Sequence, residues 1–389
     1  MHVVVVGAGL VGAAAALQLA IEGHQVTVLE RTAPAPSAAH WDLRISSVHQ
    51  RNVEWLQKLG VWTPAVAAKA FPFIGLSVQG QDGQRVEFAA PAASSMGYMV
   101  ENQALQYALW EALAAQPRVT LRTDFQLQQL ELEASTIYSF SGEALAFDLL
   151  LGADGAQSKL ASLAGIGRRG WDYGQRCMLA NVTTVAPILQ ATWEIFRRGG
   201  LGPMALLPLG TQQACLIDYR PSAQWQNISA QGAEAVAREL KQTFAPHIGA
   251  FELLELAPAV PAYASFPIQR QHALTYTRAA AAGTGLALIG DAAHSIHPLA
   301  GQGVNLGFAD VQCLVAQVSQ SALASALTQY ERERLAANQQ MMRAMDAIHF
   351  GFGSHHWLPR VGVAGLLGLL SKMPGIQRQV VRMAMGETF

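Results

Sequence analysis

Short apolar runs and helical segments alternate at the beginning of the chain. Residues 3–6 form a continuous apolar run that ends in glycine, residues 13–20 are helix-forming throughout, and residues 26–29 form a second apolar run. A buried strand of a parallel sheet is covered on both faces, so it shows a continuous apolar run instead of an alternation. The pattern therefore predicts a strand, a helix and a second strand, which together make a β-α-β unit.

Beyond this unit the pattern predicts two kinds of region. Helices and buried strands occur on both sides of a central stretch of short strands, which glycine and proline interrupt. The predicted helices cover 46–59, 103–115, 233–244, 303–318 and 322–347, and the predicted strands cover 73–88 with a turn at 81–83, 119–122, 146–151, 286–289 and short pieces between about 177 and 267. We interpret the central stretch as the sheet of a second domain.

The composition is typical of a large folded protein. The 389 residues exceed one ordinary domain and are enough for two. Hydrophobic residues make up 51% of the chain and charged residues 14%, which indicates a large buried interior or an apolar ligand. The net charge of −1 and the lack of a dense basic run before the C-terminal tail argue against a nucleic-acid partner.

The cysteines and the first residues bear on the compartment. Cys177, Cys215 and Cys313 are far apart and form no CxxC pair, which argues against a disulfide framework or a zinc ribbon. The chain enters a strand directly, without the segments of a signal peptide, and no apolar run approaches the roughly 20 residues of a spanning helix. We therefore expect a cytoplasmic protein.

A glycine-rich motif, GAGLVG at residues 7–12, lies between the first strand and the first helix. Gly7 permits a tight turn, Gly9 lets a pyrophosphate approach the backbone, and Gly12 lets the helix touch the sheet. Glu30 ends the second strand, where a carboxylate accepts hydrogen bonds from ribose hydroxyls. These flanking elements disfavour a mere glycine-rich turn, so the motif predicts a dinucleotide site and leaves FAD and NAD open.

Two later strand ends carry polar residues as well. Asp154 and Gly155 follow the apolar run at 149–151, although an Asp-Gly pair alone is more often just a turn. Asp291 follows the run at 286–289, where its carboxylate would reach the polyol chain of a flavin. The helix that begins after Pro298 would direct its N-terminal amides at the same place, and a helix N-terminus favours the negative charge of reduced flavin.

His294 and His297 have the spacing of a pair of metal ligands. No further ligand lies near them in the sequence, and two ligands do not make a metal site. We interpret both as polar groups that the loop satisfies, and we predict no metal.

The order of these motifs resembles a known family. GAGLVG with the distant Glu30, GADG at 152–155 and GDAAHSIHPLAGQGVNLG at 290–307 are similar to the single-component flavin aromatic hydroxylases of the para-hydroxybenzoate hydroxylase fold. The resemblance covers nearly the whole chain. Within that family, the ubiquinone-biosynthesis hydroxylases are the most similar, as judged by WDLRIS at 41–46, LGVW at 59–62, GYMVEN at 97–102, WDY at 171–173, YER at 330–332 and MD at 345–346.

The resemblance implies which residues hold FAD. Arg44 matches an arginine on the flavin side of the cofactor, whereas Asn102 departs from the arginine that many relatives have. The implied FAD-binding residues are Gly7, Gly9, Gly12, Glu30, Arg44, Asn102, Asp154, Gly155, Asp291, Gly301, Gln302, Gly303 and Asn305. Pro298, Gly303 and Asn305 would act at the isoalloxazine during catalysis. In relatives, residues at the corresponding positions cover the substrate face of the flavin. The residues here are Met204, Leu206, Leu207 and Pro208, and core packing is their alternative role.

The resemblance also implies a reaction. NADH or NADPH reduces FAD, O₂ adds at the flavin C4a position, and one oxygen atom is transferred to the ring of a polyprenylated phenol or quinol, with the demethoxyubiquinol ring favoured over the positions of paralogous hydroxylases. No residue of the strand region stands out as a general base, and hydroxylation of an electron-rich ring does not require one. A nicotinamide dehydrogenase, a flavoprotein reductase that does not hydroxylate and a partner-holding subunit are the alternatives.

The implied architecture is an α/β fold with interleaved domains. We expect a Rossmann-like FAD-binding domain at 1–70, 101–175 and 271–325. A mostly antiparallel substrate domain would take up 71–100 and 176–270, and a C-terminal helical region 326–389.

The last segment, 347–389, is locally basic and rich in apolar residues. Ile376, Val380 and Met383 fall on one helical face, with Arg378 and Arg382 on another side, which is typical of a helix at a membrane interface. Docking on the core of the protein or on a second subunit in a homo-oligomer is the alternative. With a polyprenyl substrate, we favour peripheral contact with the inner face of the membrane or with a biosynthetic assembly.

Overall fold

The computed structural model describes residues 1–36, 42–92, 94–197, 201–257, 260–261, 263–280, 283–298, 301–353 and 373–387. A six-stranded sheet is built on the N-terminal β-α-β unit, in which β1 lies between β12 and β2 and is parallel to both. In spatial order its strands are β21 (Thr277–Ala279), β22 (Gly285–Leu288), β12 (Leu149–Gly152), β1 (His2–Val6), β2 (Gln25–Leu29) and β8 (Val119–Arg122). Only β21 runs antiparallel to its neighbour, so the predicted unit and its parallel sheet are confirmed.

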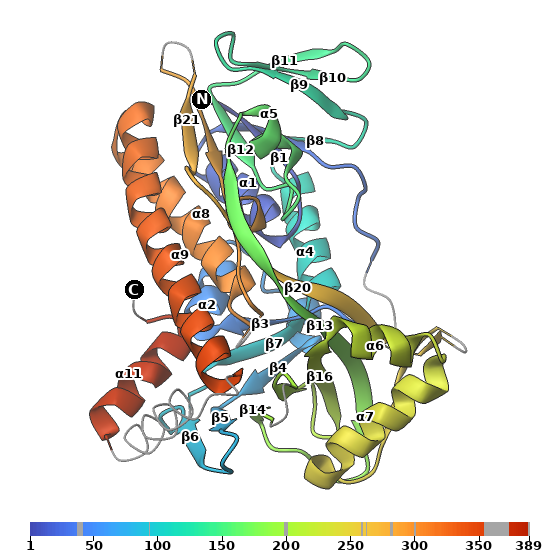
Figure 1. Ribbon diagram of the computed structural model, residues 1–389. Helices are drawn as coiled ribbons and strands as arrows, with labels where there is room; N and C mark the ends of the chain where they lie inside the picture. The colour runs from blue at the N-terminus through green and yellow to red at the C-terminus, as the bar shows by residue number, and fades with distance from the viewer. Residues whose placement is uncertain are drawn as a thin grey trace.

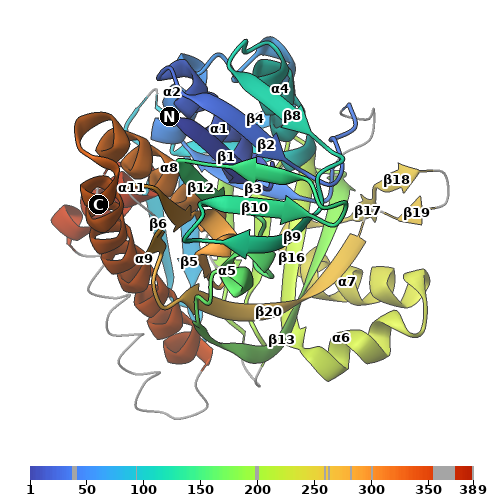
Figure 2. The ribbon, with the colours of Figure 1, turned by 90° about the horizontal axis from the view of Figure 1, so that it is seen from above.

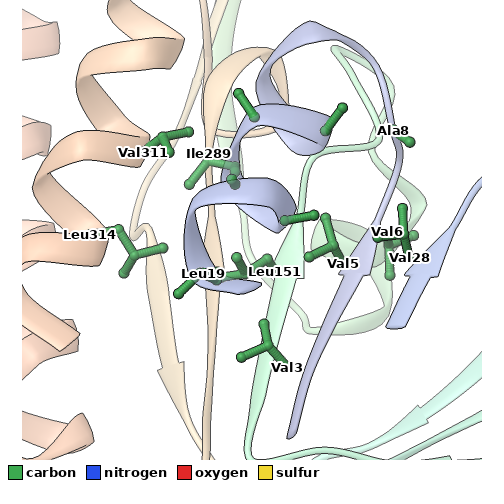
Figure 3. Close-up of a cluster of buried hydrophobic side chains, with 14 of the residues drawn as sticks. Val3, Val5, Val6, Ala8, Leu19, Val28, Leu151, Ile289, Val311 and Leu314 are labelled. Atoms are coloured by element: carbon green, nitrogen blue, oxygen red, sulfur yellow. The ribbon is translucent and has the colours of Figure 1, made fainter. Parts of the chain in front are cut away.

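Small residues let helices approach this sheet closely. Helix α1 (Leu10–Ile21) is almost completely buried and packs against α4 (Asn102–Ala114) and α8 (Gly303–Gln320). A Cβ atom at Gly307 of α8 would lie 2.4 Å from Cγ2 of Val11, closer than any real contact. Figure 3 shows the resulting core, in which side chains of β1, α1 and α8 meet.

A second sheet of nine strands is mostly antiparallel. In spatial order it contains β23 (His294–Ser295), β20 (Tyr263–Ala273), β13 (Arg168–Thr184), β16 (Gln213–Pro221), β15 (Met204–Pro208), β14 (Ala191–Ile195), β5 (Gly75–Gln79) and β6 (Arg85–Ala89), with β17 (Phe251–Leu253) beside β13. Helices α6 (Ser222–Ser229) and α7 (Ala233–Ile248) cover one of its faces (Figure 1). The sequence predicted only the second of these helices.

Two long strands connect the sheets. β13 and β20 pair along much of their length and run from the parallel sheet to the second sheet (Figures 1 and 2). The remaining elements are β3 (Ile45–His49), β4 (Ala70–Phe73), β7 (Gly97–Glu101), β9 (Leu127–Glu131), β10 (Thr136–Ser139), β11 (Ala144–Ala146), β18 (Glu255–Ala257), β19 (Val260–Pro261), α2 (Gln50–Lys58), α3 (Pro64–Ala68), α5 (Lys159–Leu163), η1 (Gly290–Ala292), α9 (Leu323–Gly353) and α11 (Pro374–Ala384).

The predicted helix over 46–59 is wrong in its first turn. Residues 45–49 form β3, which pairs with β7, and the helix begins only at Gln50. Val48, which completed the helical spacing in the sequence, is a buried strand residue instead. The mixed α/β fold itself is confirmed, while the exact domain limits stay a prediction.

Helix α11 lies against the core of the protein. Val381 and Met385 are buried among side chains of β4, β6 and β7, and the Met385 carbonyl accepts a hydrogen bond from the Arg51 amide. Val380 and Val381 therefore agree with the alternative prediction, in which this helix docks on the core of the protein. The apolar and basic residues at 354–372 and the side chain of Ile376 lie outside the described residues. No helix in the described part of the chain is long and apolar enough to cross a membrane.

The buried carboxylate of Asp310 joins α8, α9 and the loop after β22. One of its oxygens accepts hydrogen bonds from the Gly290 amide at 3.0 Å and from His294 Nε2 at 2.6 Å. The other accepts from Arg334 Nε at 2.8 Å and from Asn338 Nδ2 at 3.1 Å. Burial alone would raise the pKa of Asp310, but His294 and Arg334 outweigh it and lower the pKa to about 2.

We expect Asp310→Asn to lower the free energy of unfolding by about 3 kcal/mol or more, because it leaves Arg334 buried without its counter-charge. Urea denaturation at pH 7 measures the loss, and Asp124→Asn, which breaks an exposed pair with Arg122, serves as the control with a much smaller loss. The folded pKa of Asp310 is lowered, so its contribution is present above the ordinary value of 3.8 and is lost as the pH falls towards 2. A loss no larger than that of the control would contradict this role.

Candidate functional site

The three glycines of the first motif have different steric surroundings. Gly7 has φ +97°, and a Cβ atom there would lie 2.4 Å from the Ala153 carbonyl oxygen, so no other residue fits. At Gly12 a Cβ atom would lie 2.0 Å from the Gly7 oxygen, which is why α1 can begin so close to β1. A Cβ atom at Gly9 would meet nothing within 4 Å. Gly9 therefore faces open space, where a phosphate can approach the backbone.

Glu30 lies next to this loop. Its carboxylate accepts a hydrogen bond from the Ala8 amide at 2.8 Å and another from the Arg31 amide at 2.7 Å. On the other side the Ala8 carbonyl accepts from Trp110 Nε1 at 3.0 Å and from Gln106 Nε2 at 3.1 Å. The loop is thus held from β2 and from α4, and the acidic strand end lies where the sequence placed it.

The second motif follows the neighbouring strand β12. One oxygen of Asp154 accepts a hydrogen bond from the Leu160 amide at 3.0 Å, and Oδ1 is buried with no hydrogen-bond partner in the described structure. Gly155 has φ +82°, a left-handed conformation that favours glycine. A buried carboxylate oxygen without a partner is costly, which indicates that a ligand supplies the missing donor.

Arg44 and Asn102 lie together although they are far apart in the sequence. The Arg44 carbonyl accepts a hydrogen bond from the Asn102 amide at 2.9 Å, where β3 and β7 pair. The Arg44 side chain is exposed, and Oδ1 of Asn102 is buried with no hydrogen-bond partner among the described residues. Trp41 of the same motif lies outside those residues.

The third motif leaves the parallel sheet at β22. Asp291 lies in η1, and its side chain reaches solvent although protein surrounds it on most sides. This desolvation raises the pKa of Asp291, while His294 opposes the rise. Gly301 has φ +62°, and α8 begins at Gly303, directly after Gln302. Leu299 and Ala300 lie outside the described residues.

The Asn305 side chain is fully occupied by the protein. Its oxygen accepts hydrogen bonds from the His49 amide at 3.0 Å and from Asn52 Nδ2 at 2.9 Å, and its nitrogen donates to the Ser47 carbonyl at 2.7 Å. The amide therefore fixes the N-terminus of α8 against β3. The contact of Asn305 with the flavin stays a prediction, and these hydrogen bonds show that its side chain positions the start of α8.

Neither histidine of the motif is placed to bind a metal. His294 is bonded to Asp310, and His297 packs between the rings of Tyr173, Tyr219 and His349. Burial lowers the pKa of His297 to about 3. Among the described residues no group of three or more potential ligands has the geometry of a metal site.

A cavity of about 190 Å³ separates the third motif from the second sheet. Pro298, Gly301 and Gln302 lie on one wall, and the facing wall is the side of the sheet that α6 and α7 leave uncovered. Side chains of a strand alternate between faces. Leu207 therefore lines the cavity, whereas Met204 and Leu206 pack under α6 and α7. Pro208, at the end of the same strand, is buried but is not part of the lining.

The cavity wall contains polar residues that the sequence did not single out: His49, Cys177, Thr192, Glu194 and Tyr219. Cys177 and Tyr219 are cross-strand partners whose side chains form a hydrogen bond. In the sequence, Thr192 and Glu194 alternate with apolar residues of β14, which is the pattern of an exposed strand face. The alternation in the sequence therefore predicted that Thr192 and Glu194 face solvent.

The site as a whole fits FAD. Gly9 faces open space directly after β1, Glu30 follows β2, and Asp154 and Asn102, which each have a buried oxygen without a partner among the described residues, follow β12 and β7. The N-terminus of α8 adds a positive helix end beside Gln302, and this favours an anion.

Comparisons with known proteins agree with this reading. A family model described as "FAD binding domain" matches residues 1–345. The chain is 37% identical to the 3-demethoxyubiquinol 3-hydroxylase of Escherichia coli, over 99% of this chain and 98% of that protein. It is 30% identical to the ubiquinone hydroxylase UbiL of Rhodospirillum rubrum, over 99% and 89%. The crystal structure of p-nitrophenol 4-monooxygenase PnpA from Pseudomonas putida shares the fold, with a TM-score of 0.76 at 16% identity over 97% and 96% of the chains.

Gly9→Ala is expected to lower the affinity for FAD at least about tenfold while leaving the fold intact, because its methyl group enters the open space of the loop. Gly9 has φ −66° and ψ −173°, which alanine adopts without strain. Flavin titration of the apoprotein measures the affinity, and thermal unfolding measures the stability. The matched control Gly12→Ala should instead destabilise the apoprotein by about 1 to 3 kcal/mol. Unchanged flavin affinity in Gly9→Ala would remove the loop from the site.

Asp291→Ala should weaken FAD binding about ten- to hundredfold, since it removes a charged hydrogen-bond partner at the end of β22. Fluorescence quenching of FAD on titration with apoprotein gives the dissociation constant. Glu133→Ala, which removes an exposed carboxylate between β9 and β10, is the control and should bind FAD as the unaltered protein does. Equal affinities in the two variants would rule out Asp291 as a ligand.

Proposed function

The chain belongs to the FAD-binding family of flavoprotein monooxygenases, and on that premise we propose that it hydroxylates the aromatic ring of a polyprenylated quinol in ubiquinone biosynthesis. The observation that carries the substrate class is the 37% identity to a 3-demethoxyubiquinol 3-hydroxylase along almost the full length of both chains. The E. coli name makes demethoxyubiquinol the first choice of substrate. UbiL, also aligned over nearly the whole chain, is described only as a ubiquinone hydroxylase, so another ring position is the second candidate.

The size and lining of the cavity support a ring substrate. An apolar cavity of about 150 Å³ is enough to bind benzene. The cavity of about 190 Å³ therefore accommodates one substituted ring but not an isoprenoid chain, which has to extend out of it. Most of its wall is apolar, with Phe73, Leu76, Met99 and Ile217 among the lining residues. Such a wall excludes water from the reacting groups.

FAD, when bound, supplies the redox chemistry, in which NADH or NADPH is the electron donor and O₂ the source of the transferred oxygen atom. The chain supplies binding and position. Asn305 holds the N-terminus of α8 against β3, and the amides there favour negative charge on the flavin. Pro298, Gly301 and Gln302 line the ring cavity just before α8 and would hold the flavin at its edge.

The C-terminal region adds a finer proposal, which concerns delivery of the substrate. Ala384 of α11 lines the ring cavity, and α11 docks on the core beside it. We place the exit of the isoprenoid chain next to this helix, and with it the peripheral contact of the C-terminal region with the membrane or with a biosynthetic assembly.

The function is tested with purified protein that carries FAD. We expect a short-chain demethoxyubiquinol to stimulate NADH or NADPH oxidation and to yield a hydroxylated quinol that contains one oxygen atom from ¹⁸O₂. A flavoprotein reductase would oxidise the nicotinamide without incorporating the label, and a partner-holding subunit would show no stimulation. If protein with full flavin occupancy yields no labelled product from quinols or phenols, the proposed hydroxylation is wrong.

A further inference from the structure

Glu194 is the carboxylic acid on the substrate side of the ring cavity. It lies on β14, and its cross-strand neighbours on the same face are Ala205 and, one strand further, Ile217, which both line the cavity. Pro298, Gly301 and Gln302, which lead into α8, line the same cavity. A ring held in the cavity would therefore be bordered both by the start of α8 and by Glu194.

The carboxyl group has no partner within the described structure. Glu194 is half-buried and borders the cavity, and no hydrogen bond or ion pair to its side chain occurs among the described residues. Desolvation is the cause that raises the pKa of Glu194, from 4.5 to about 8. A carboxyl group in the wall of a cavity, without a protein partner among the described residues, is available to hydrogen-bond the ligand of that cavity.

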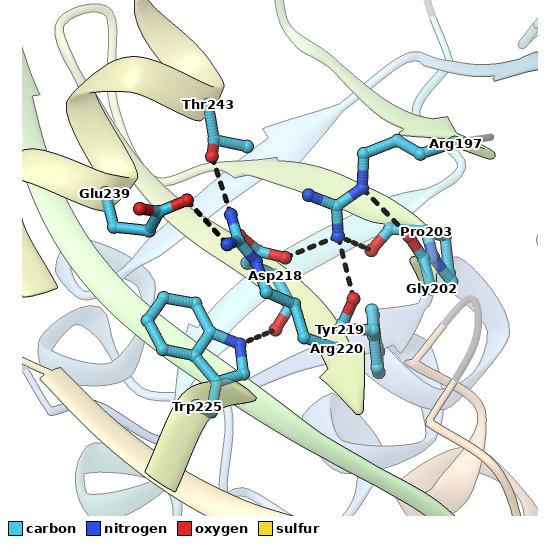
Figure 4. Close-up of polar contacts among 9 residues, drawn as sticks. All are labelled: Arg197, Gly202, Pro203, Asp218, Tyr219, Arg220, Trp225, Glu239 and Thr243. Atoms are coloured by element: carbon cyan, nitrogen blue, oxygen red, sulfur yellow. Dashed lines mark hydrogen bonds and ion pairs between the residues drawn. The ribbon is translucent and has the colours of Figure 1, made fainter. Parts of the chain in front are cut away.

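The ion-paired charged groups of the described residues around β14 and β16 lie on the other face of the sheet. Asp218 is bonded to Arg197 and Arg220, and Arg220 also reaches Glu239 of α7. Figure 4 shows this network, with the Trp225 ring nitrogen donating to the Asp218 carbonyl. Because neighbouring residues of β16 alternate in direction, Tyr219 faces the cavity while this ion-pair network faces α6 and α7.

Four titratable side chains line the cavity: His49, Cys177, Glu194 and Tyr219. Burial lowers the pKa of His49 to about 4. Burial also raises the pKa of Cys177 and of Tyr219 well above their ordinary values. Among the described lining residues, Glu194 is therefore the group that changes charge between pH 6 and 9.

We propose that Glu194 binds a hydroxyl group of the quinol and acts as the general base that takes its proton while the ring is oxygenated. In this step the substrate O–H bond breaks, the electron pair stays on the substrate oxygen, and the proton forms an O–H bond with the Glu194 carboxylate. The charge left on the oxygen makes the ring a better nucleophile towards the oxygen atom that the FAD reaction supplies. Once the ring carbon has lost its own proton to solvent, Glu194 returns the stored proton to the substrate oxygen.

This role rests on the proposed function, and the pH dependence of turnover tests it. We expect kcat/KM of the unaltered protein to rise about tenfold per pH unit below about pH 8 and to level off above it, since only the carboxylate accepts a proton. Glu194→Gln should lower kcat/KM about a hundredfold at pH 8 and abolish this rise. Glu194→Asp should retain the rise, and Glu87→Gln, an exposed glutamate of the same sheet, should behave as the unaltered protein.

A second measurement does not depend on turnover. The folded pKa of Glu194 is raised above its unfolded value, so the folded state holds a proton that the unfolded state has already lost, and stability falls as the pH rises from about 4.5 to 8. Glu194→Gln has no such proton, and we expect its midpoint of thermal unfolding to exceed that of the unaltered protein at pH 8.5 but not at pH 4.5.

The outcomes separate the two proposals. Absence of hydroxylated product from the unaltered protein would reject the proposed function and the role of Glu194 with it. Product formation together with an unchanged pH profile in Glu194→Gln would reject the role of Glu194 alone. A difference in unfolding midpoint that is the same at both pH values would also reject it, because Glu194 would then not titrate in the working range.

Discussion

The buried carboxylate of Asp310 is the interaction on which the geometry of the site depends. It binds the backbone of the loop after β22 at Gly290, the ring of His294 in the same loop, and two side chains of α9. A charge buried in this way is tolerated only because every oxygen has donors around it. Asp310 therefore anchors the loop that contains Asp291 and leads to Pro298 against α8.

Asp310 and Glu194 illustrate opposite solutions to the burial of a carboxyl group. Asp310 has four donors and a pKa lowered to about 2, and it contributes stability. Glu194 has no protein partner among the described residues and a pKa raised to about 8, and it costs stability at neutral pH. Polar groups that lower stability in this way tend to occur where a ligand is bound. The contrast distinguishes a carboxylate that supports the fold from one that faces a substrate.

The ring cavity exists because two sheets are joined by long strands. β13 and β20 carry the chain from the nucleotide-binding sheet to the antiparallel sheet, so the flavin loop and the substrate wall come from separate parts of the sequence. The antiparallel sheet has one face under α6 and α7 and the other face turned to the cavity. Because α6 and α7 cover only one face of the antiparallel sheet, its other face is accessible to a ligand.

The sequence by itself determined the parallel sheet and the nucleotide loop, since these depend on local patterns. Continuous apolar runs specify doubly covered strands, and the glycine spacing between a strand and a helix marks the loop, although the contact that excludes a side chain at Gly7 comes from the distant Ala153. Local spacing did not determine β3, where Val48 completed a helical pattern but pairing with β7 produced a strand. Nor did it reveal Glu194, because an alternating strand has the same sequence pattern whether its polar face meets water or a cavity. Which of the two it meets depends on strand order and on the element packed opposite, and these are decided only by the tertiary structure.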